Sequence, residues 1–223
     1  MLQPRQSIEL PDARLAGDLL MPDGARGLVV FVHGSGSSRS SPRNQHVARY
    51  LCERGLATLL FDLLTEAEDR VDRVTCEMRF DISMLTHRLV GVLDWLAAKS
   101  ELKHLPIGLF GASTGAAAAI LAAIQRPDRV DAIVSRGGRT DLAGSELCRL
   151  SAPILQIVGA RDRVTLGLNR KASRALVCEQ GLEVIPGATH LFEEPGALEE
   201  VARLAGQWFE THLGDPVQGP TRF

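Results

Sequence analysis

The chain has 223 residues and a formal net charge of −2, from 27 acidic and 25 basic side chains. This balance gives no electrostatic reason to expect nucleic acid or an anionic membrane as a partner. Hydrophobic residues make up 45% of the chain and charged residues 23%, which is typical of a globular protein with a buried core. No linker-like stretch divides the sequence, so we expect one domain over residues 1–213 and a loose tail over 214–223.

Short apolar runs alternate with segments of helical periodicity along the chain. Two alternating stretches at the start, SIEL and RLAGDLL, suggest an antiparallel hairpin at a sheet edge. In chain order there follow strand 27–32, helix 42–54, strand 57–61, helix 79–99, strand 107–110, helix 114–126, strands 132–135 and 154–158, helix 165–179, strand 183–185 and helix 195–213. The strand runs lack polar alternation, which indicates burial on both faces. We therefore predict an α/β fold, a doubly wound and mostly parallel sheet with helices on both faces.

Two connecting segments affect access to any site on this sheet. Residues 136–153 are too few to build a cap of several helices, so we expect an open site without a cap domain. The segment Thr65–Asp81 is densely charged, and we expect a mobile, solvated loop there. A gate over the substrate is the alternative interpretation.

The four cysteines, Cys52, Cys76, Cys148 and Cys178, are widely spaced. Their spacing matches neither a metal site nor a redox motif, so we expect buried or idle thiols, no metal and a cytoplasmic location. The first residues lack an apolar run behind a basic start, and no run elsewhere is long enough to cross a bilayer. We expect neither a signal peptide nor a membrane partner, and the oligomeric state stays open.

The strand at 107–110 runs into the pentapeptide Gly111-Ala112-Ser113-Thr114-Gly115, and an alanine-rich helix follows. A sharp turn between a strand and a helix needs small residues on either side, because the chain passes close to itself there. Such a turn raises a serine hydroxyl above the sheet, at the positive end of the helix. Ser113 is therefore the candidate nucleophile; a glycine-rich packing turn is the alternative.

A serine hydroxyl needs a base, and the base needs an acid partner. His190 lies in a loop after the last predicted strand, at the sheet edge that Ser113 occupies, and Asp162 follows strand 154–158. The chain order Ser, Asp, His is the order that this fold uses. The alternatives are a loop histidine and an aspartate that caps the helix near Thr165, and Asp141 is a rival acid.

Acyl transfer also needs N–H groups for the oxyanion. The first long strand ends in His33-Gly34-Ser35-Gly36-Ser37-Ser38, where glycines let backbone amides approach a substrate. We assign the N–H groups of Ser35 and Thr114 to the oxyanion hole, with Gly36 as the second choice for Ser35 and as a substrate-binding residue. We expect His33 to hold the loop by hydrogen bonds.

With these motifs, the sequence resembles the α/β-hydrolase superfamily, and within it the dienelactone hydrolase-like proteins. The resemblance rests on VFVHGSGSS, GLFGASTGAAAA, ILQIVGARD and GATHLF, in that order, and spans roughly residues 28–213. It implies Ser113 as nucleophile, Asp162 as acid, His190 as base and oxyanion donors at Ser35 and Thr114, without a cofactor. Dienelactone hydrolases proper have a cysteine nucleophile, so an esterase of different scope is the safer expectation.

The expected reaction is hydrolysis of a small-molecule carboxylic ester or lactone through an acyl-enzyme. Thioesterase, peptidase or acyltransferase activity with the same three residues is an alternative, as is a ligand-binding protein that keeps the fold without hydrolysis. Arginines near the strand ends suggest an acidic substrate, with Arg39 as a binding residue. The plainer interpretation is that these arginines brace loops or pair with aspartates.

Overall fold

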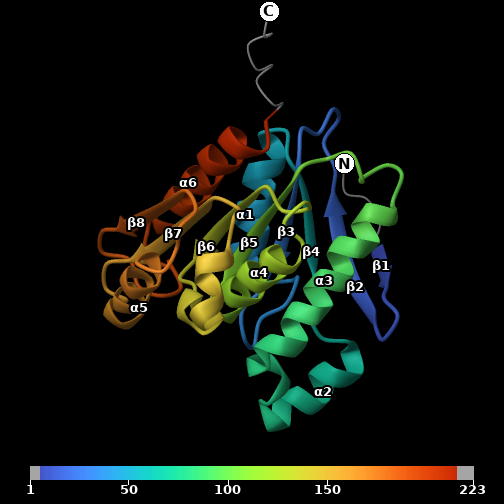
Figure 1. Ribbon diagram of the computed structural model, residues 1–223, viewed down its shortest axis with the longest axis horizontal. Helices are drawn as coiled ribbons and strands as arrows, with labels where there is room; N and C mark the ends of the chain where they lie inside the picture. The colour runs from blue at the N-terminus through green and yellow to red at the C-terminus, as the bar shows by residue number, and fades with distance from the viewer. Residues whose placement is uncertain (1–5, 215–223) are drawn as a thin grey trace, which may run out of the picture.

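Eight strands form a single sheet in the computed structural model, which describes residues 6–214 (Figure 1). The strands are β1 (Gln6–Glu9), β2 (Arg14–Leu20), β3 (Leu28–Val32), β4 (Ala57–Phe61), β5 (Ile107–Ala112), β6 (Ala132–Arg136), β7 (Ile154–Gly159) and β8 (Gln180–Ile185). Their order is β1-β2-β4-β3-β5-β6-β7-β8. β1, β2 and β4 pair antiparallel, and every later pair is parallel. The predicted mostly parallel sheet and its antiparallel edge hairpin are confirmed.

Helices cover both faces of the sheet. They are α1 (Pro42–Glu53), α2 (Glu66–Thr75), α3 (Ile82–Ala98), α4 (Thr114–Gln125), α5 (Arg163–Ser173) and α6 (Ala197–His212), with 3₁₀ segments η1 (Met78–Phe80) and η2 (Thr140–Arg149). α3 and α4 lie in front of the sheet in Figure 1, and α1 and α6 lie behind it. The doubly wound arrangement is confirmed. Of the predicted tail, only Gly214 lies among the described residues.

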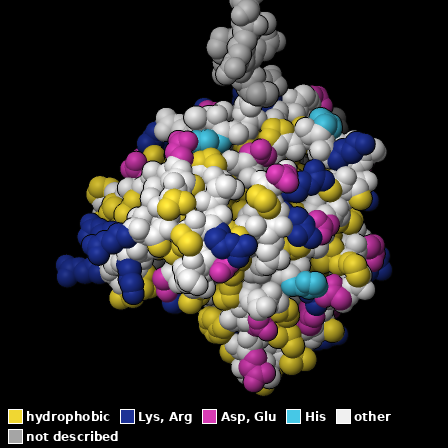
Figure 2. Space-filling model, viewed as in Figure 1, with side chains coloured by type: hydrophobic (Ala, Val, Ile, Leu, Met, Phe, Trp, Pro, Cys, Tyr) yellow, Lys and Arg dark blue, Asp and Glu magenta, His cyan; other side chains and the backbone are white. Residues whose placement is uncertain are grey.

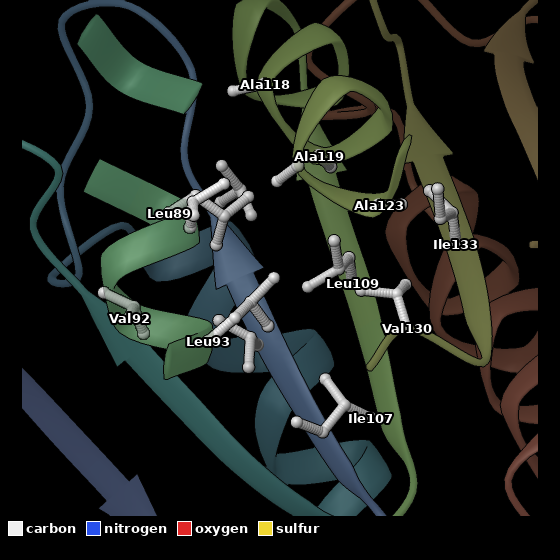
Figure 3. Close-up of a cluster of buried hydrophobic side chains, with 14 of the residues drawn as sticks. Leu89, Val92, Leu93, Ile107, Leu109, Ala118, Ala119, Ala123, Val130 and Ile133 are labelled. Atoms are coloured by element: carbon white, nitrogen blue, oxygen red, sulfur yellow. The ribbon is translucent and has the colours of Figure 1, made fainter. Parts of the chain in front are cut away.

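Two apolar layers hold the helices to the sheet. On one face, Leu89 and Leu93 of α3 and Ala119 of α4 pack over Leu109 of β5 (Figure 3). On the other face, Phe209 of α6 belongs to a second buried cluster with α1 and the opposite sides of the strands. The run of alanines in α4 lets this helix lie close to the sheet, which fixes the height of its first residue above the strands.

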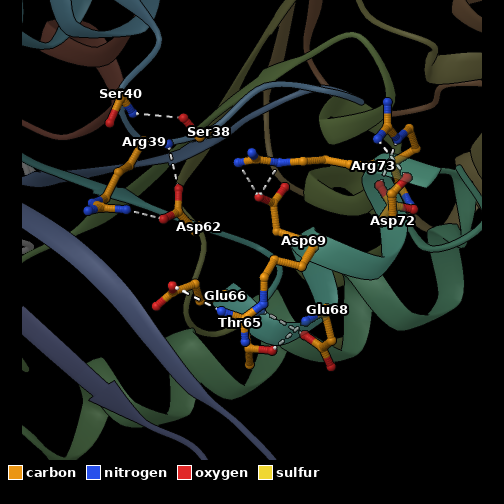
Figure 4. Close-up of polar contacts among 12 residues, drawn as sticks. Ser38, Arg39, Ser40, Asp62, Thr65, Glu66, Glu68, Asp69, Asp72 and Arg73 are labelled. Atoms are coloured by element: carbon orange, nitrogen blue, oxygen red, sulfur yellow. Dashed lines mark hydrogen bonds and ion pairs between the residues drawn. The ribbon is translucent and has the colours of Figure 1, made fainter. Parts of the chain in front are cut away.

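The prediction of a mobile loop over Thr65–Asp81 is wrong for most of this segment, because residues 66–75 form helix α2. The Thr65 hydroxyl accepts the N–H of Glu68 at 3.2 Å, and the Glu68 carboxylate accepts the N–H of Thr65 at 2.7 Å (Figure 4). This reciprocal capping starts the helix without an apolar face. α2 projects beyond the sheet at the bottom of Figure 1. Its role as a gate over the substrate stays a prediction.

Residues 136–153 contain only η2, which is interrupted at Gly144 and packs against α4. Within residues 6–214 no cap domain is inserted between β6 and β7, as expected. The predicted helix 165–179 begins two residues earlier and ends at Ser173, and β8 takes up the residues from Gln180. These boundary differences leave the carboxyl ends of the strands where they were expected.

Surface side chains of both charges are intermingled on the face shown in Figure 2. In the part of the chain that the structure describes, no helix combines the length and apolar character of a membrane span. All four cysteines are free, and Cys76 and Cys148 are exposed while Cys52 and Cys178 are half-buried. The expectation of buried or idle thiols therefore takes its second form at Cys76 and Cys148, which are unpaired and exposed.

Candidate active site

Ser113 occupies a strained turn between β5 and α4. Its φ of 49° and ψ of −122° lie outside the ordinary regions for a residue with a side chain. The turn is closed by backbone contacts, because a Cβ on Gly111 would lie 2.6 Å from the Cα of Ala116. A Cβ on Gly115 would lie 2.2 Å from the carbonyl oxygen of Val32. The backbone is therefore as crowded around Ser113 as predicted, and no side chain fits at Gly111 or Gly115.

His190 and Asp162 meet at the carboxyl edge of the sheet. His190 Nδ1 donates to Asp162 Oδ2 at 2.6 Å, while Asp162 Oδ1 accepts the N–H of Thr165 at 3.2 Å. Both interpretations of Asp162, as partner of the histidine and as helix cap, are thus correct. Burial of the carboxylate opposes ionisation, but the hydrogen bonds from His190 and Thr165 outweigh it and hold the pKa of Asp162 below its usual value. The rival acid, Asp141, pairs instead with Arg139 at 2.8 Å.

The segment after β6 joins Ser113 to His190. Ser113 N–H donates to the carbonyl of Arg136 at 3.2 Å, and the Ser113 carbonyl accepts the N–H of Arg139 at 2.9 Å. Between these anchors, Gly137 has a φ of +52°, and a Cβ there would lie 3.4 Å from Nδ1 and Cε1 of the His190 ring. Among residues 6–214 the Ser113 hydroxyl makes no hydrogen bond in this state. Hydrogen bonds between a catalytic hydroxyl and its base are often long in the free enzyme and shorten only when substrate binds.

The loop after β3 lies directly against Ser113, the candidate nucleophile. A Cβ on Gly34 would be 2.9 Å from the Cβ of Ser113. His33 donates from Nδ1 to the Gly34 carbonyl at 3.0 Å and accepts the N–H of Leu63 at Nε2, also at 3.0 Å. Burial lowers the pKa of His33, which favours the neutral ring that these two bonds require. The expected loop-holding role of His33 is confirmed.

The two residues assigned to the oxyanion hole contact each other. The Ser35 N–H donates to the Thr114 hydroxyl at 2.9 Å, so an oxyanion would replace that hydroxyl as the acceptor. The second choice, Gly36, has a φ of +67°, and a Cβ there would lie 3.3 Å from Nη1 of Arg79. Arg79 in turn donates from Nε to the carboxylate of Asp72 at 2.6 Å. The charged segment after β4 therefore contacts the loop after β3 at Gly36.

Arg39, the predicted substrate-binding residue, is already paired. Its guanidinium forms an ion pair with Asp62 and lies 3.3 Å from Asp18, and its N–H donates to Asp62 at 2.7 Å (Figure 4). These contacts match the plainer interpretation, in which arginines brace loops. The substrate-binding role of Arg39 stays a prediction, as does that of Gly36.

An open, polar groove of about 1370 Å³ lies beside the loop after β3. Its walls come from the β1–β2 hairpin, the loop at 36–43 and α2, and they include Arg39, Arg73 and Arg79. Ser113 and His190 do not line it. Gly36, in the loop after β3, is one of its lining residues. Within residues 6–214 no three His, Cys, Asp or Glu side chains are grouped as a metal site requires.

Neither Gly137 nor Arg79 was predicted to take part in the site, and Arg79 was expected only as the first residue of the helix 79–99. The consecutive glycines of SRGGRTD, directly after a strand, were the available signal for Gly137. The sequence pattern did not predict the contact between Arg79 and Gly36, because that contact depends on how α2 and η1 pack against the loop after β3. Phe192, two residues after His190, has a φ of 57° and is fully buried, a second strained position in the site.

Comparison with known proteins identifies the family of this chain. Residues 23–144 match the family described as serine aminopeptidase, S33. The structure of a dienelactone hydrolase from Anabaena variabilis is 50% identical, with a TM-score of 0.93, and the match covers 95% of this chain and 98% of that one. The chain belongs to the α/β-hydrolase superfamily, in its dienelactone hydrolase-like branch. The esterase Est1E from Butyrivibrio proteoclasticus, 16% identical with a TM-score of 0.78 over 95% of this chain and 99% of that one, shares the fold of this α/β-hydrolase.

Two curated relatives of this α/β-hydrolase carry a different name. They are putative phosphoribosyl transferases from two strains of Mycobacterium tuberculosis, 54% identical over 207 residues. The match covers 93% of this chain and 45% of each relative, so the chain spans about half the length of the curated relatives it matches.

Proposed function

We propose that this α/β-hydrolase cleaves carboxylic esters or lactones through an acyl-enzyme on Ser113. The observation that carries the proposal is the strained Ser113 backbone, at φ 49° and ψ −122°, beside a His190–Asp162 pair held at 2.6 Å. Strain of this kind persists where the surrounding structure enforces it, and it exposes the hydroxyl of a nucleophile.

The reaction proceeds in two halves. The Ser113 oxygen attacks the carbonyl carbon while His190 Nε2 takes its proton, and Asp162 stabilises the resulting imidazolium. The oxyanion accepts the N–H groups of Ser35 and Thr114, replacing the Thr114 hydroxyl as partner of Ser35. His190 then gives the proton to the departing alkoxide. Water repeats the cycle on the acyl-enzyme and releases the acid.

Thioesterase, peptidase and acyltransferase activities remain within reach of the same three residues. The match to the serine aminopeptidase family favours testing an amide, because a peptidase must protonate an amine as it leaves. Comparing an ester, a thioester and an anilide of one acyl group separates these activities. The proposal expects the ester to have the highest kcat/KM.

The name phosphoribosyl transferase belongs to proteins of which this chain matches only 45%. We assign hydrolase chemistry to the matched segment, because that segment includes the positions of Ser113, Asp162 and His190. Transfer of a phosphoribosyl group by this chain alone is the competing assignment. Assaying this chain for release of pyrophosphate from a phosphoribosyl donor tests it directly.

A fluorophosphonate probe, which reacts with activated serines, tests the proposed nucleophile. Wild type should be labelled, Ser113→Ala should not, and Ser100→Ala, which changes an exposed serine in a distant turn, should be labelled like wild type. Mass spectrometry should then locate an acyl adduct on Ser113 after exposure to short-chain p-nitrophenyl esters. An unlabelled, folded wild type that binds a ligand tightly would instead support a non-hydrolytic binding protein.

A further inference from the structure

Exposed apolar side chains gather where the strands of the sheet end. Among residues 6–214, seven large apolar side chains are exposed to solvent. Three of them belong to α2 and η1, and one precedes β8 at the opposite edge of the sheet. The remaining three follow the carboxyl ends of β6, β7 and β8, and they are Leu142, Val164 and Leu191. Exposed apolar side chains that are grouped, unlike single ones, mark a binding surface.

Two of these side chains directly adjoin the candidate catalytic residues. Leu191 is the residue after His190, and Val164 lies two residues after Asp162, in the first turn of α5. The hydrogen bond of 2.6 Å between His190 and Asp162 holds these two segments together. Leu191 and Val164 therefore flank the imidazole and its acid partner.

Leu142 is tied to the same place through the turn after β6. Its N–H donates to the Arg139 carbonyl at 3.0 Å, and the Arg139 N–H donates to the Ser113 carbonyl at 2.9 Å. The fully buried Asn169 of α5 joins this turn to α5, because its amide donates to the Gly138 carbonyl at 2.8 Å. Buried hydrogen bonds thus fix the three segments that carry the exposed apolar side chains.

The chemistry of the proposed reaction decides which part of a substrate meets these side chains. His190 protonates the departing oxygen, so this oxygen has to lie within hydrogen-bond reach of His190 Nε2. The alcohol portion of the ester therefore extends past the imidazole, on the side of Leu191 and Val164. The polar groove lies elsewhere, beside the loop after β3, and these apolar side chains are not among its lining residues.

We propose that Leu142, Val164 and Leu191 form an apolar rim that binds the alcohol portion of the substrate, so that the esters cleaved here are esters of alkyl alcohols. This inference rests on the proposed function and adds a substrate class to it. An alkyl chain on the apolar rim removes apolar surface of both partners from water. A methylene group fully removed from water improves binding about fourfold, and one covered on one side only about twofold.

Two series of esters test which portion the apolar rim binds. The first combines acetate with ethyl, butyl and hexyl alcohol, and the second consists of the ethyl esters of acetic, butanoic and hexanoic acid. In wild type, kcat/KM from proton release at constant pH should rise about 16-fold from ethyl to hexyl acetate, at about twofold for each methylene. The second series should rise less. An equal or steeper rise in the second series, or no rise in the first, would overturn the inference and leave the proposed function standing.

Two valines provide a matched pair of variants. Val164 and Val177 are both 75% exposed, but Val164 follows the carboxyl end of β7 and Val177 precedes the amino end of β8. The rise along the alcohol series should drop to about eightfold in Val164→Ser and to about fourfold or less in Val164→Ser/Leu191→Ser, while Val177→Ser keeps the full rise. A full rise in the folded double variant contradicts the inference. If the double variant does not fold, Val164→Ser against Val177→Ser decides.

If wild type cleaves none of these esters, the proposed function fails, and NMR of side-chain methyl groups still reads the apolar rim. Added hexan-1-ol should shift the methyl resonances of Leu142, Val164 and Leu191 and leave those of Val177 in place. Ethanol at the same concentration should shift none of them. Equal shifts at Val164 and Val177, or no shifts with hexan-1-ol, would contradict an alcohol-binding rim.

Discussion

The backbone N–H of Ser35 donates a hydrogen bond to the side-chain oxygen of Thr114, 2.9 Å away and 79 positions further along the chain. This bond ties the loop after β3 to the first residue of α4. It holds one proposed oxyanion donor in place beside the other.

Thr114→Val removes the acceptor and keeps the side-chain shape. We expect kcat/KM for esters to rise by up to roughly fivefold, because the Ser35 N–H no longer has to give up a hydrogen bond worth about 1 kcal/mol before it donates to the oxyanion. Thr114→Ser keeps the hydroxyl and should stay within about twofold of wild type. A fall in kcat/KM for Thr114→Val would show that the bond is not exchanged for one to the oxyanion.

Asp162 divides its carboxylate between His190 and the first turn of α5, and substitutions can separate the two contacts. Asp162→Asn retains a cap for Thr165 but no anion for the imidazolium, while Asp162→Ala loses both. Both variants should lose roughly 10⁴-fold in kcat. Only Asp162→Ala should also lose about 1 kcal/mol of unfolding free energy in urea titrations. Equal stability losses in the two variants would contradict a capping role.

The steric demand at the turn predicts opposite effects of the same substitution at two helical glycines. A methyl group at Gly115 would lie 2.2 Å from a carbonyl oxygen, whereas nothing lies within 4 Å of one at Gly167. Gly115→Ala should cost about 3 kcal/mol or more and abolish fluorophosphonate labelling. Gly167→Ala, in exposed α5, should add about 0.5–1 kcal/mol of stability. Thermal unfolding of both variants checks the contrast.

Acid should weaken the contact between Asp72 of α2 and Arg79, the residue that lies beside Gly36. Burial of Asp72 opposes its ionisation, but hydrogen bonds from Arg79 prevail and lower its pKa. The unfolded chain therefore binds the proton more readily, and this stabilisation is complete above about pH 5, well over the ordinary value of ~3.9. It is lost as the pH falls through the folded value. Asp72→Asn should show a flatter dependence of the urea midpoint on pH between about 5 and 2.5.

Removing the buried charge of Arg136 should stabilise the free protein. Its pKa in the folded chain is about 10, below the ordinary 12.5, so below pH 10 the charged form costs folding free energy. Arg136→Met should gain at least about 1 kcal/mol at pH 7, or about 2–4 °C in Tm, and Arg136→Lys should gain less. The cost fades as pH rises through 10. A lower Tm for Arg136→Met without ligand would mean that the cation already has a stabilising partner.

Most of the fold could be predicted because buried parallel strands and amphipathic helices leave distinct patterns. α2 escaped prediction because its apolar residues, Val71 and Val74, are both exposed, so the helix has no apolar stripe. Its start was readable locally in the capping pair Thr65 and Glu68. The dense charge of the segment Thr65–Asp81 favoured the expectation of a loop in spite of this capping pair.

The candidate site was predictable to the extent that it follows strand ends. Asp162 and His190 were paired from their positions after β7 and β8, and the structure brings them to 2.6 Å. The state of each arginine was not predictable, because Arg39 and Arg136 look alike in sequence. One meets aspartates from β2 and the end of β4, and the other faces an amide, a ring and a second arginine.

The short connection through η2 bears on the fate of the acyl group that we propose to form on Ser113. With no helical roof between β6 and β7, bulk solvent meets that ester as readily as any second alcohol does. The concentration of water is on the order of tens of molar, so in a site without a cap domain water is far more abundant than any competing acyl acceptor. The architecture thus biases the second half-reaction toward release of a free acid, and away from passing the acyl group to another molecule.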